Sequence, residues 1–245
     1  MKQAILNALS ALNISDYSMT EQQRSSAELF FIKKRLDMRR VKDTHEYSVT
    51  VYNVFEEDGK KFRGSSTVIL FPGTEAAEIT HQLEDAYNAA GYVKNPYYDL
   101  YEGHKEAVKE VPSTLSAHTL SQNAELMAAA LFAADTRDDA WLNSAEIFAC
   151  RDHISIFAST GTDVSYVKYS KGEFVAQAKE PQDVEQYFSF TYNGLDTDAL
   201  ADKVRHALDA VCDRAHATDC PEAGTYDVVL SDRHMATLMN LYVTR

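Results

Sequence analysis

Two segments of the sequence follow the same order of signals, and this repetition constrains the fold more than any other feature. Residues 27–90 and 145–211 each open with Ala-Glu, an aliphatic residue and Phe, continue through a strand-like stretch and end in a helical pattern. Between these ends, residues 44–52 match residues 161–169 at a constant offset. Repetition at this scale indicates that one supersecondary unit occurs twice.

The central part of each segment predicts antiparallel strands. Tyr47, Val49 and Val51 alternate with polar residues, which is the two-residue period of a half-buried strand. Asp58-Gly59 predicts a hairpin turn, because glycine adopts positive φ without a steric penalty. Lys171-Gly172 is expected to form the corresponding turn of the second segment.

Both segments end in a predicted amphipathic helix. Thr74 is expected to cap the first helix, and the residues from Asp196 to Asp198 are expected to cap the second. The apolar positions of the two helices correspond one to one: Ile79, Leu83, Ala86, Tyr87 and Ala90 in the first, and Leu200, Val204, Ala207, Leu208 and Val211 in the second. This spacing places each set on one face of a helix.

These patterns predict an α+β fold with two tandem units of antiparallel β-meander plus a long helix, followed by a short strand at 226–230 and a C-terminal helix. The expected divisions are an N-terminal helical arm (1–26), the first unit (27–95), a linker and helix (96–144), and the second unit with the terminal strand and helix (145–245). Around the start of the linker lie Tyr92, Tyr97, Tyr98 and Tyr101, which are expected to cover a junction between subdomains.

Composition excludes several classes of function. Of the 245 residues, 45% are hydrophobic and 25% charged, as in globular proteins, and the formal net charge is −13. Such a charge repels phosphate backbones, so no direct nucleic-acid binding is expected. No long apolar run and no signal-peptide pattern occur, so no membrane association is expected. The three cysteines lack Cys-x-x-Cys spacing, which favours reduced thiols and a cytoplasmic location.

The second segment contains runs that are typical of a known family. These are Ala145 to Phe148, Ser159 to Gly161, Ser165-Tyr166 and, above all, Gly-Thr-Tyr-Asp-Val-Val-Leu-Ser at 224–231 ahead of a Leu- and Met-containing helix. Together they resemble the N-terminal half of the TldD/PmbA proteins. That family is described both as candidate modulators of DNA gyrase and as metal-dependent peptidases that degrade or mature peptides.

The resemblance also implies where a metal site would lie. In the active subunit type of the family, the helix after the Val-Val-Leu run carries His-Glu-x-x-x-His, which holds a divalent metal and supplies a general base. The same place here reads Asn-Leu-Tyr-Val-Thr-Arg: Asn240 is a weak ligand, Leu241 cannot act as a base, and Arg245 would repel a cation. The resemblance therefore implies the metal-free PmbA/TldE type, with no catalytic residue and no cofactor in this chain and zinc only in a partner.

One alternative metal site stays open from the residues themselves. Cys212, His216 and Cys220 have the spacing Cys-x-x-x-His-x-x-x-Cys, which puts the three ligands on one face if the helix continues to Cys220. Pro221 argues against that continuation. His81 with Asp85 on the first helix is interpreted as a solvated ion pair.

We therefore expect a PmbA/TldD-like module of a peptidase system that is not catalytic itself. It would bind a peptide substrate, added to a free strand edge, or a partner subunit, either a homologous TldD-like protein or a second copy in a homodimer. Two alternatives remain. One is a metal-dependent peptidase whose site is completed by a missing C-terminal half or a partner, and the other is a structural or regulatory binding module unrelated to proteolysis.

Overall fold

The structure, a computed structural model, describes residues 1–100, 109–230 and 232–244; for residues 109–110, 162–166 and 232–233 it describes the backbone alone. Tyr101, Ser231 and Arg245 lie outside the described residues, as does the side chain of Ser165. The chain forms two compact units, Met1–Ala215 and His216–Arg245. Each unit is described by itself below.

The first unit contains six long strands and four α-helices in the described part of the chain. The helices are α1 (Lys2–Ala11), α2 (Ala76–Ala90), α3 (Leu120–Ala133) and α4 (Thr197–Ala215), and a 3-10 turn, η1 (Thr114–Ala117), precedes α3. The strands are β1 (Tyr17–Ile32), β2 (Arg35–Glu57), β3 (Lys60–Leu70), β5 (Ala140–Ala158), β6 (Gly161–Ala178) and β7 (Val184–Tyr192), with a two-residue strand, β4 (Lys109–Glu110). Three consecutive antiparallel strands followed by a helix thus occur twice, which agrees with the predicted α+β class.

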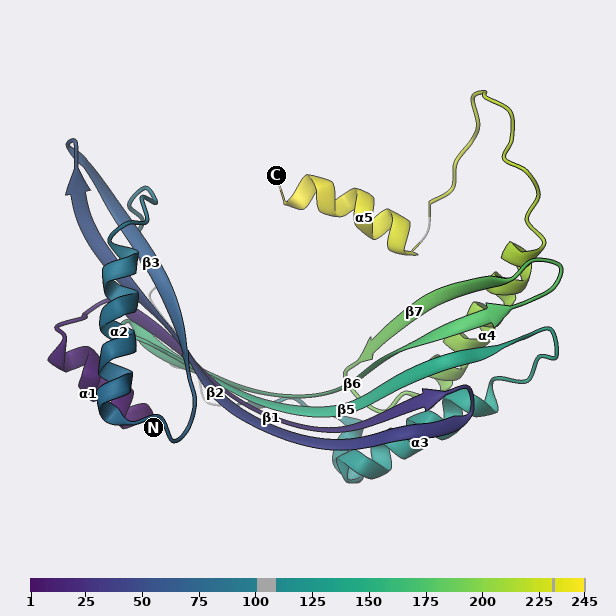
Figure 1. The fold of residues 1–245 in the computed structure, drawn as a ribbon, viewed down its shortest axis with the longest axis horizontal. Coiled ribbons are helices and arrows are strands. Elements are labelled where there is room, and N and C mark those ends of the chain that lie inside the picture. Colours follow the sequence, from purple (N-terminus) through teal and green to yellow (C-terminus); the bar gives the residue numbers. More distant parts are fainter. Residues whose placement is uncertain (101–108, 231, 245) are drawn as a thin grey trace. The chain divides into compact units, whose positions relative to one another are not determined.

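All six long strands belong to one antiparallel sheet, which is curled like half of a barrel (Figure 1). The strand order is β3-β2-β1-β5-β6, and β7 pairs with the second part of β6, residues 170–178. β4 pairs with Ser165 and Tyr166 of β6 in the parallel sense. The first three strands are joined to the last three through the β1–β5 pair, in which Ser18 lies opposite Ala158 and Ile32 lies opposite Ser144.

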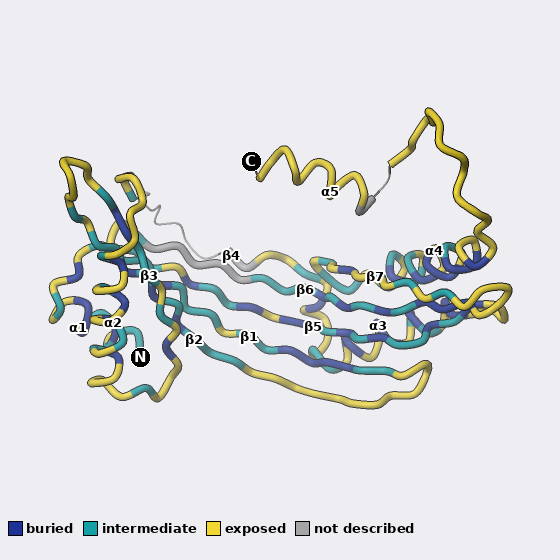
Figure 2. Tube along the Cα trace, turned by 45° about the horizontal axis from the view of Figure 1, so that its top comes forward, coloured by how far each residue is buried: buried dark blue, intermediate teal, exposed yellow. Residues whose placement is uncertain are grey.

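Two apolar clusters lie between the sheet and the helices, at opposite ends of β1. One cluster joins α1 and α2 to Met19, Val49 and Leu70, and the other joins α3 and α4 to Leu29 and Phe174. Figure 2 shows the buried stretches of each strand where the helices cover it. Of the ten apolar positions predicted for the closing helices, nine are buried, and Tyr87 packs against its cluster while partly buried. Burial of these side chains is the main term that holds the helices on the sheet.

The β2–β3 turn has the predicted chemistry. Asp58 and Gly59 have φ of 51° and 71°, the positive values that a tight two-residue hairpin turn requires. The α4 cap is also confirmed, since Asp196 Oδ1 accepts a hydrogen bond of 3.0 Å from the Ala199 N–H.

Four local predictions are wrong. Lys171-Gly172 lies inside β6, paired with β5 and β7, and not in a turn. The glycine is needed there for close packing, because a Cβ would lie 2.3 Å from the Glu146 carbonyl oxygen and 2.7 Å from the Phe190 ring. Thr74 does not cap α2, since its hydroxyl donates to the Phe71 carbonyl and Glu75 occupies the cap position. Residues 226–230 form no strand, because their backbone has no neighbouring strand to pair with among the described residues.

The fourth wrong prediction is the residue-by-residue alignment of the strands in the two segments. Residues 27–30 lie in the second half of β1, whereas residues 145–148 lie in the first half of β5. The two runs are neighbours in the sheet, with Leu29 opposite Ile147. Their similarity therefore reflects a shared position beside the same apolar cluster, since alternating small and large apolar residues suit both strands there.

The second unit contains helix α5 (Asp232–Val243). Its large apolar side chains are exposed, including Met235, Leu238 and Met239, as are Val228 and Val229 ahead of it. No helix in the described part of the chain has the length and apolar character that a membrane span needs.

Candidate functional site

Within the described residues of the first unit, the helices pack against one face of the sheet. Successive side chains of a strand point to opposite faces, so Leu29 packs under α3 and α4 while Arg24 and Glu28 point the other way. Within the described part of the first unit, no helix joins the apolar clusters from this second side. We call it the open face; its central side chains are Gln22, Arg24, Ser26, Glu28 and Phe30 of β1, with Glu146, Phe148, Cys150 and Asp152 opposite them on β5.

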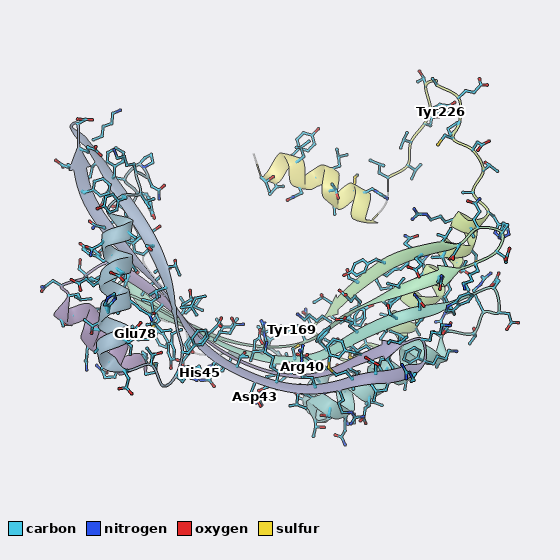
Figure 3. All side chains as sticks on the ribbon, in the orientation of Figure 1. Arg40, Asp43, His45, Glu78, Tyr169 and Tyr226 are labelled. Carbon is cyan, nitrogen blue, oxygen red and sulfur yellow. The ribbon has the colours of Figure 1, made fainter. Side chains whose placement is uncertain are left out.

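A buried carboxylate organises the middle of the open face. Both oxygens of Asp152 accept hydrogen bonds from Arg24, at 2.8 Å from Nε and 2.7 Å from Nη2. Gln22 and the Tyr169 hydroxyl donate to the same carboxylate at 3.3 Å. The hydrogen bond with Asp152 raises the pKa of Arg24, so this guanidinium stays charged. The network fixes three polar side chains of β1 and β6 around one acid. The side chain from β6, Tyr169, is labelled in Figure 3.

The adjacent thiol is not activated. Cys150 is buried, and desolvation raises its pKa above the ordinary value. Nucleophilic cysteines need the opposite shift, since the thiolate is the reactive form. Desolvation likewise raises the pKa of Tyr169, so this phenol remains protonated and acts as a hydrogen-bond donor.

A second buried carboxylate, that of Glu28, lies further along β1, opposite Phe148 of β5. Glu28 accepts a hydrogen bond from the Ser26 hydroxyl at 2.7 Å and from Arg40 Nε of β2 at 2.6 Å. The Arg40 guanidinium also lies 5.3 Å from the centre of the Phe30 ring. Because both buried acids have an arginine partner, the charges of this part of the face are neutralised in pairs.

Next to these pairs the open face becomes partly apolar and contains a cleft. Phe30 meets Phe148 edge to face, with ring centres 5.7 Å apart. Beyond Phe30 a cleft of about 270 Å³ is lined by Phe30, Met38, Glu146, Glu173, Val175 and Tyr187, among other residues. It crosses strands β2, β1, β5, β6 and β7, so all parts of the sheet at this end contribute to one recess.

Two carboxylates lie opposite each other in the cleft. Glu146 of β5 pairs in register with Glu173 of β6, and the Tyr187 hydroxyl donates to Glu173 Oε2 at 2.7 Å. Burial raises the pKa of Glu146, and the charge of Glu173 adds to the shift. Like charges at directly opposed positions disfavour double ionisation. The cleft therefore combines aromatic and aliphatic walls with acidic groups, which suits a side chain or backbone that carries hydrogen-bond donors.

A polar band on the helix-covered face was not predicted from the sequence. Glu21 Oε1 accepts hydrogen bonds from the Tyr47 hydroxyl at 2.7 Å and from Gln23 Nε2 at 3.2 Å, and lies 2.8 Å from His45 Nε2. Burial would raise the pKa of Glu21, but the hydrogen bonds together outweigh it, so the pKa is lowered. The Ser155 hydroxyl lies 3.5 Å from His153 Nε2 on the same face. Only the sheet register brings these residues together.

The positions that the family resemblance relates to a metal motif lie in the second unit. Asn240 and Leu241 are exposed in α5, and Arg245 lies outside the described residues. α4 ends at Ala215, so the helical spacing does not carry on from Cys212 to His216 and Cys220. In the described residues no group of three or more His, Cys, Asp or Glu has metal-binding geometry. Metal binding by these three residues stays an untested alternative.

The other histidine considered from the sequence forms the expected surface pair. His81 Nδ1 lies 3.0 Å from Asp85 Oδ2 on α2, and each side chain is more than half exposed. Near the linker, Tyr97 and Tyr98 pack around buried Arg63 of β3, which also pairs with Asp16 at 3.0 Å. These tyrosines therefore cover the β3 edge of the sheet, where Phe62 bridges to Pro96.

The fold is similar to that of two solved structures. A candidate modulator of a DNA gyrase from Thermotoga maritima MSB8 matches with a TM-score of 0.62 and 9% sequence identity, over 90% of this chain and 50% of its own. TldE from Thermococcus kodakarensis matches with a TM-score of 0.54 and 10% identity, over 84% of this chain and 47% of its own. The chain thus spans about half the length of each. No protein-family model matches the sequence, and no curated protein matches it significantly.

These matches confirm, at the level of the fold, the resemblance to the TldD/PmbA proteins predicted from the sequence. At 9% and 10% identity they carry no residue roles from one protein to the other. The activity of this chain must therefore be argued from its own surface.

Proposed function

We propose that this chain is a non-catalytic module of a peptidase system and that it holds an extended peptide on the open face of its sheet. The observation that carries the proposal is the cleft at Phe30, Met38 and Tyr187, on a sheet shared with a TldE protein. A recess of this size holds one or two side chains of a longer ligand.

The chemistry of the open face fits a peptide better than a small charged metabolite. The arginines at its centre already neutralise Asp152 and Glu28, so they offer no unpaired positive charge to an anion. The cleft beside them offers aromatic contact and acceptor oxygens of Glu146 and Glu173, which match backbone N–H groups and basic side chains.

The role without catalysis is supported by the chemistry at the centre of the open face, around Asp152, Cys150 and Glu28. The thiol of Cys150 has a raised pKa, and the two buried acids are tied to arginines, so neither is available as a base. We further propose that hydrolysis belongs to a partner subunit, which would be a homologous TldD-like protein that carries the zinc. The three free cysteines fit a cytosolic location.

The proposal is tested by peptide binding. Fluorescence anisotropy of labelled unstructured peptides should show saturable binding to the wild-type chain, weakened at least about tenfold by Tyr187→Ala, since one buried aromatic contact is worth more than about 1 kcal/mol at a binding centre. Tyr92→Ala, at a tyrosine that is 86% exposed and absent from the cleft, is the matched control and should bind as the wild type does. Equal loss in both variants, or no binding at all, contradicts the assignment.

The same peptides decide between this role and the two alternatives. Cleavage by the chain alone that stops with a chelator would show a working metallopeptidase and direct attention to Cys212, His216 and Cys220. Cleavage only after a His-Glu-x-x-x-His subunit is added would support a two-subunit peptidase. Absence of binding and cleavage would favour a module unrelated to proteolysis.

A further inference from the structure

The outer edge of β2 is longer than the strand that covers it. β3 pairs only with residues 47–57, and residues 35–46 pair with β1 alone. Among the described residues no strand lies on the outer side of residues 35–46, which we call the β2 edge. Val41, at its centre, is 66% exposed, which leaves an apolar side chain without cover. An open edge of this length is a template for another strand.

The opposite end of the same sheet shows what such an edge accepts. β7 pairs only with residues 170–178 of β6, so residues 161–169 extend beyond it in the same way. There the chain adds a strand of its own, since β4 pairs with Ser165 and Tyr166. The sheet therefore already accommodates an added strand at one of its two overhanging edges, while the β2 edge has none in the described part of the chain.

We propose that the β2 edge pairs with the β2 edge of a second copy of this chain, antiparallel and with the two-fold axis at Val41. The two sheets then become one continuous sheet through a self-complementary interface. This inference specifies how the chain associates with itself, goes beyond the peptide-binding role and does not depend on it.

The charges on the helix-covered side of the edge are self-complementary about that axis. Along β2 the side chains on this side include Arg39, Val41 and Asp43, which pair in register with alternate residues of β1. In the antiparallel arrangement Arg39 faces Asp43 of the second copy. The symmetry produces this contact twice, and the two exposed Val41 side chains meet at the axis. Cross-strand pairs of opposite charge stabilise antiparallel strands.

Existing contacts leave these side chains accessible. Arg39 pairs with Glu125 of α3 at 2.9 Å, but about half of each side chain is exposed, so the guanidinium can contact a second acid. Asp43 is exposed on the same strand as Arg40 (Figure 3). On the other side of the edge Arg40 would face Lys42 of the second copy. The repulsion between these two cations is weakened, because Glu28 already neutralises Arg40.

The two neighbouring registers lack the Arg39–Asp43 contact. Opposed residues lie on the same face of a sheet, so the register can shift only in steps of two residues. Each such step moves the two-fold axis by one residue. An axis at Arg40 would bring Arg39 against Val41 of the second copy, and an axis at Lys42 would bring Val41 against Asp43 of the second copy. Neither shifted register retains the Arg39–Asp43 contact, whereas the axis at Val41 makes it twice.

Charge exchange tests this pairing directly. Sedimentation velocity over a range of concentrations should show a wild-type dimer. Arg39→Asp or Asp43→Arg alone should raise the dimer dissociation constant about tenfold or more, because each replaces two attractive contacts with two repulsive ones. A mixture of the two single variants should form a heterodimer about as tight as the wild type, since each position 39 then meets a position 43 of opposite charge. The double variant should dimerise again for the same reason.

Further variants separate this interface from a general effect of charge or folding. Val41→Lys places two lysines at the axis and should also weaken the dimer, while circular dichroism should remain that of the wild type. Arg205→Asp and Asp202→Arg, at an exposed pair on α4, are the controls and should leave the dissociation constant unchanged. A wild-type chain that stays monomeric, or a dimer that tolerates both single exchanges, overturns the inference. A monomer that still binds peptide leaves the proposed function in place.

Discussion

The Arg24 guanidinium holds both oxygens of the Asp152 carboxylate, at 2.8 and 2.7 Å across the β1–β5 pair. Arg137 holds Asp139 with the same two distances at the surface. The acids differ in burial: the side chain of Asp152 is 5% exposed and that of Asp139 is 56% exposed. Arg137 also pairs with Asp209, whose side chain is 63% exposed. The protein thus contains two ion pairs of equal geometry in different dielectric surroundings.

Removing the arginine should therefore have unequal effects on the free energy of unfolding. Arg24→Met leaves a buried carboxylate with only two neutral donors, and we expect a loss of about 2 to 3 kcal/mol. Arg137→Met at the surface should cost about 0.5 kcal/mol. Urea denaturation of both variants measures the difference. Equal losses would show that the burial of Asp152 does not govern the strength of this pair.

Two glycine positions should also respond differently to alanine. At Gly172 a Cβ would meet the Glu146 carbonyl oxygen at 2.3 Å, so β5 and β6 must move apart, and we expect a loss of about 3 kcal/mol. At Gly59 nothing lies within 4 Å of the added Cβ, and only the positive φ is strained, which costs about 1 kcal/mol. Thermal unfolding compares the two variants. If Gly59→Ala is the more destabilising, the close approach at Gly172 is not as described.

The helices could be predicted from the sequence because their signals are local. The five apolar positions from Ile79 to Ala90 and the five from Leu200 to Val211 follow from helical spacing alone. Asp58-Gly59 could be predicted as well, since few dipeptides adopt two positive φ values. The fold resemblance followed from short runs around these elements.

The strands and the candidate site could not be predicted in the same way. Whether Gly172 lies in a turn or a strand depends on Phe190 and Glu146, which approach it only after the sheet forms. The pairs Arg24–Asp152 and Arg40–Glu28 depend on the register between strands, and nothing in one strand specifies it. The cleft draws residues from five strands, so its position follows from the strand order rather than from any motif.

The three cysteines should differ in their rate of reaction with a thiol reagent. Cys220 is exposed, whereas Cys150 and Cys212 are buried and desolvation raises the pKa of both thiols. We expect one fast thiol in the native protein, lost in Cys220→Ser, and two that react only on unfolding. Rapid labelling of Cys150 would contradict the packing described for the open face. Protection of Cys220 by added zinc would instead support the alternative metal site with Cys212 and His216.

The acidic pair of the cleft should make stability depend on pH in a defined direction. The pKa of Glu146 is raised above its ordinary value of 4.5, first by burial and then by the charge of Glu173. The folded state therefore binds more protons than the unfolded state at pH values from about 4.5 up to the raised pKa, so stability falls as the pH increases through this window. Glu146→Gln removes the effect.

We expect the free energy of unfolding of this variant to match that of the wild type near pH ~4 and to exceed it by about 0.5 kcal/mol near pH ~7. Urea denaturation at both pH values measures the change, and in a Glu173→Gln background the gain should shrink because the opposing charge is gone. A variant that is less stable than the wild type at the higher pH would mean that Glu146 gains more from hydrogen bonds in the cleft than it loses to burial and repulsion.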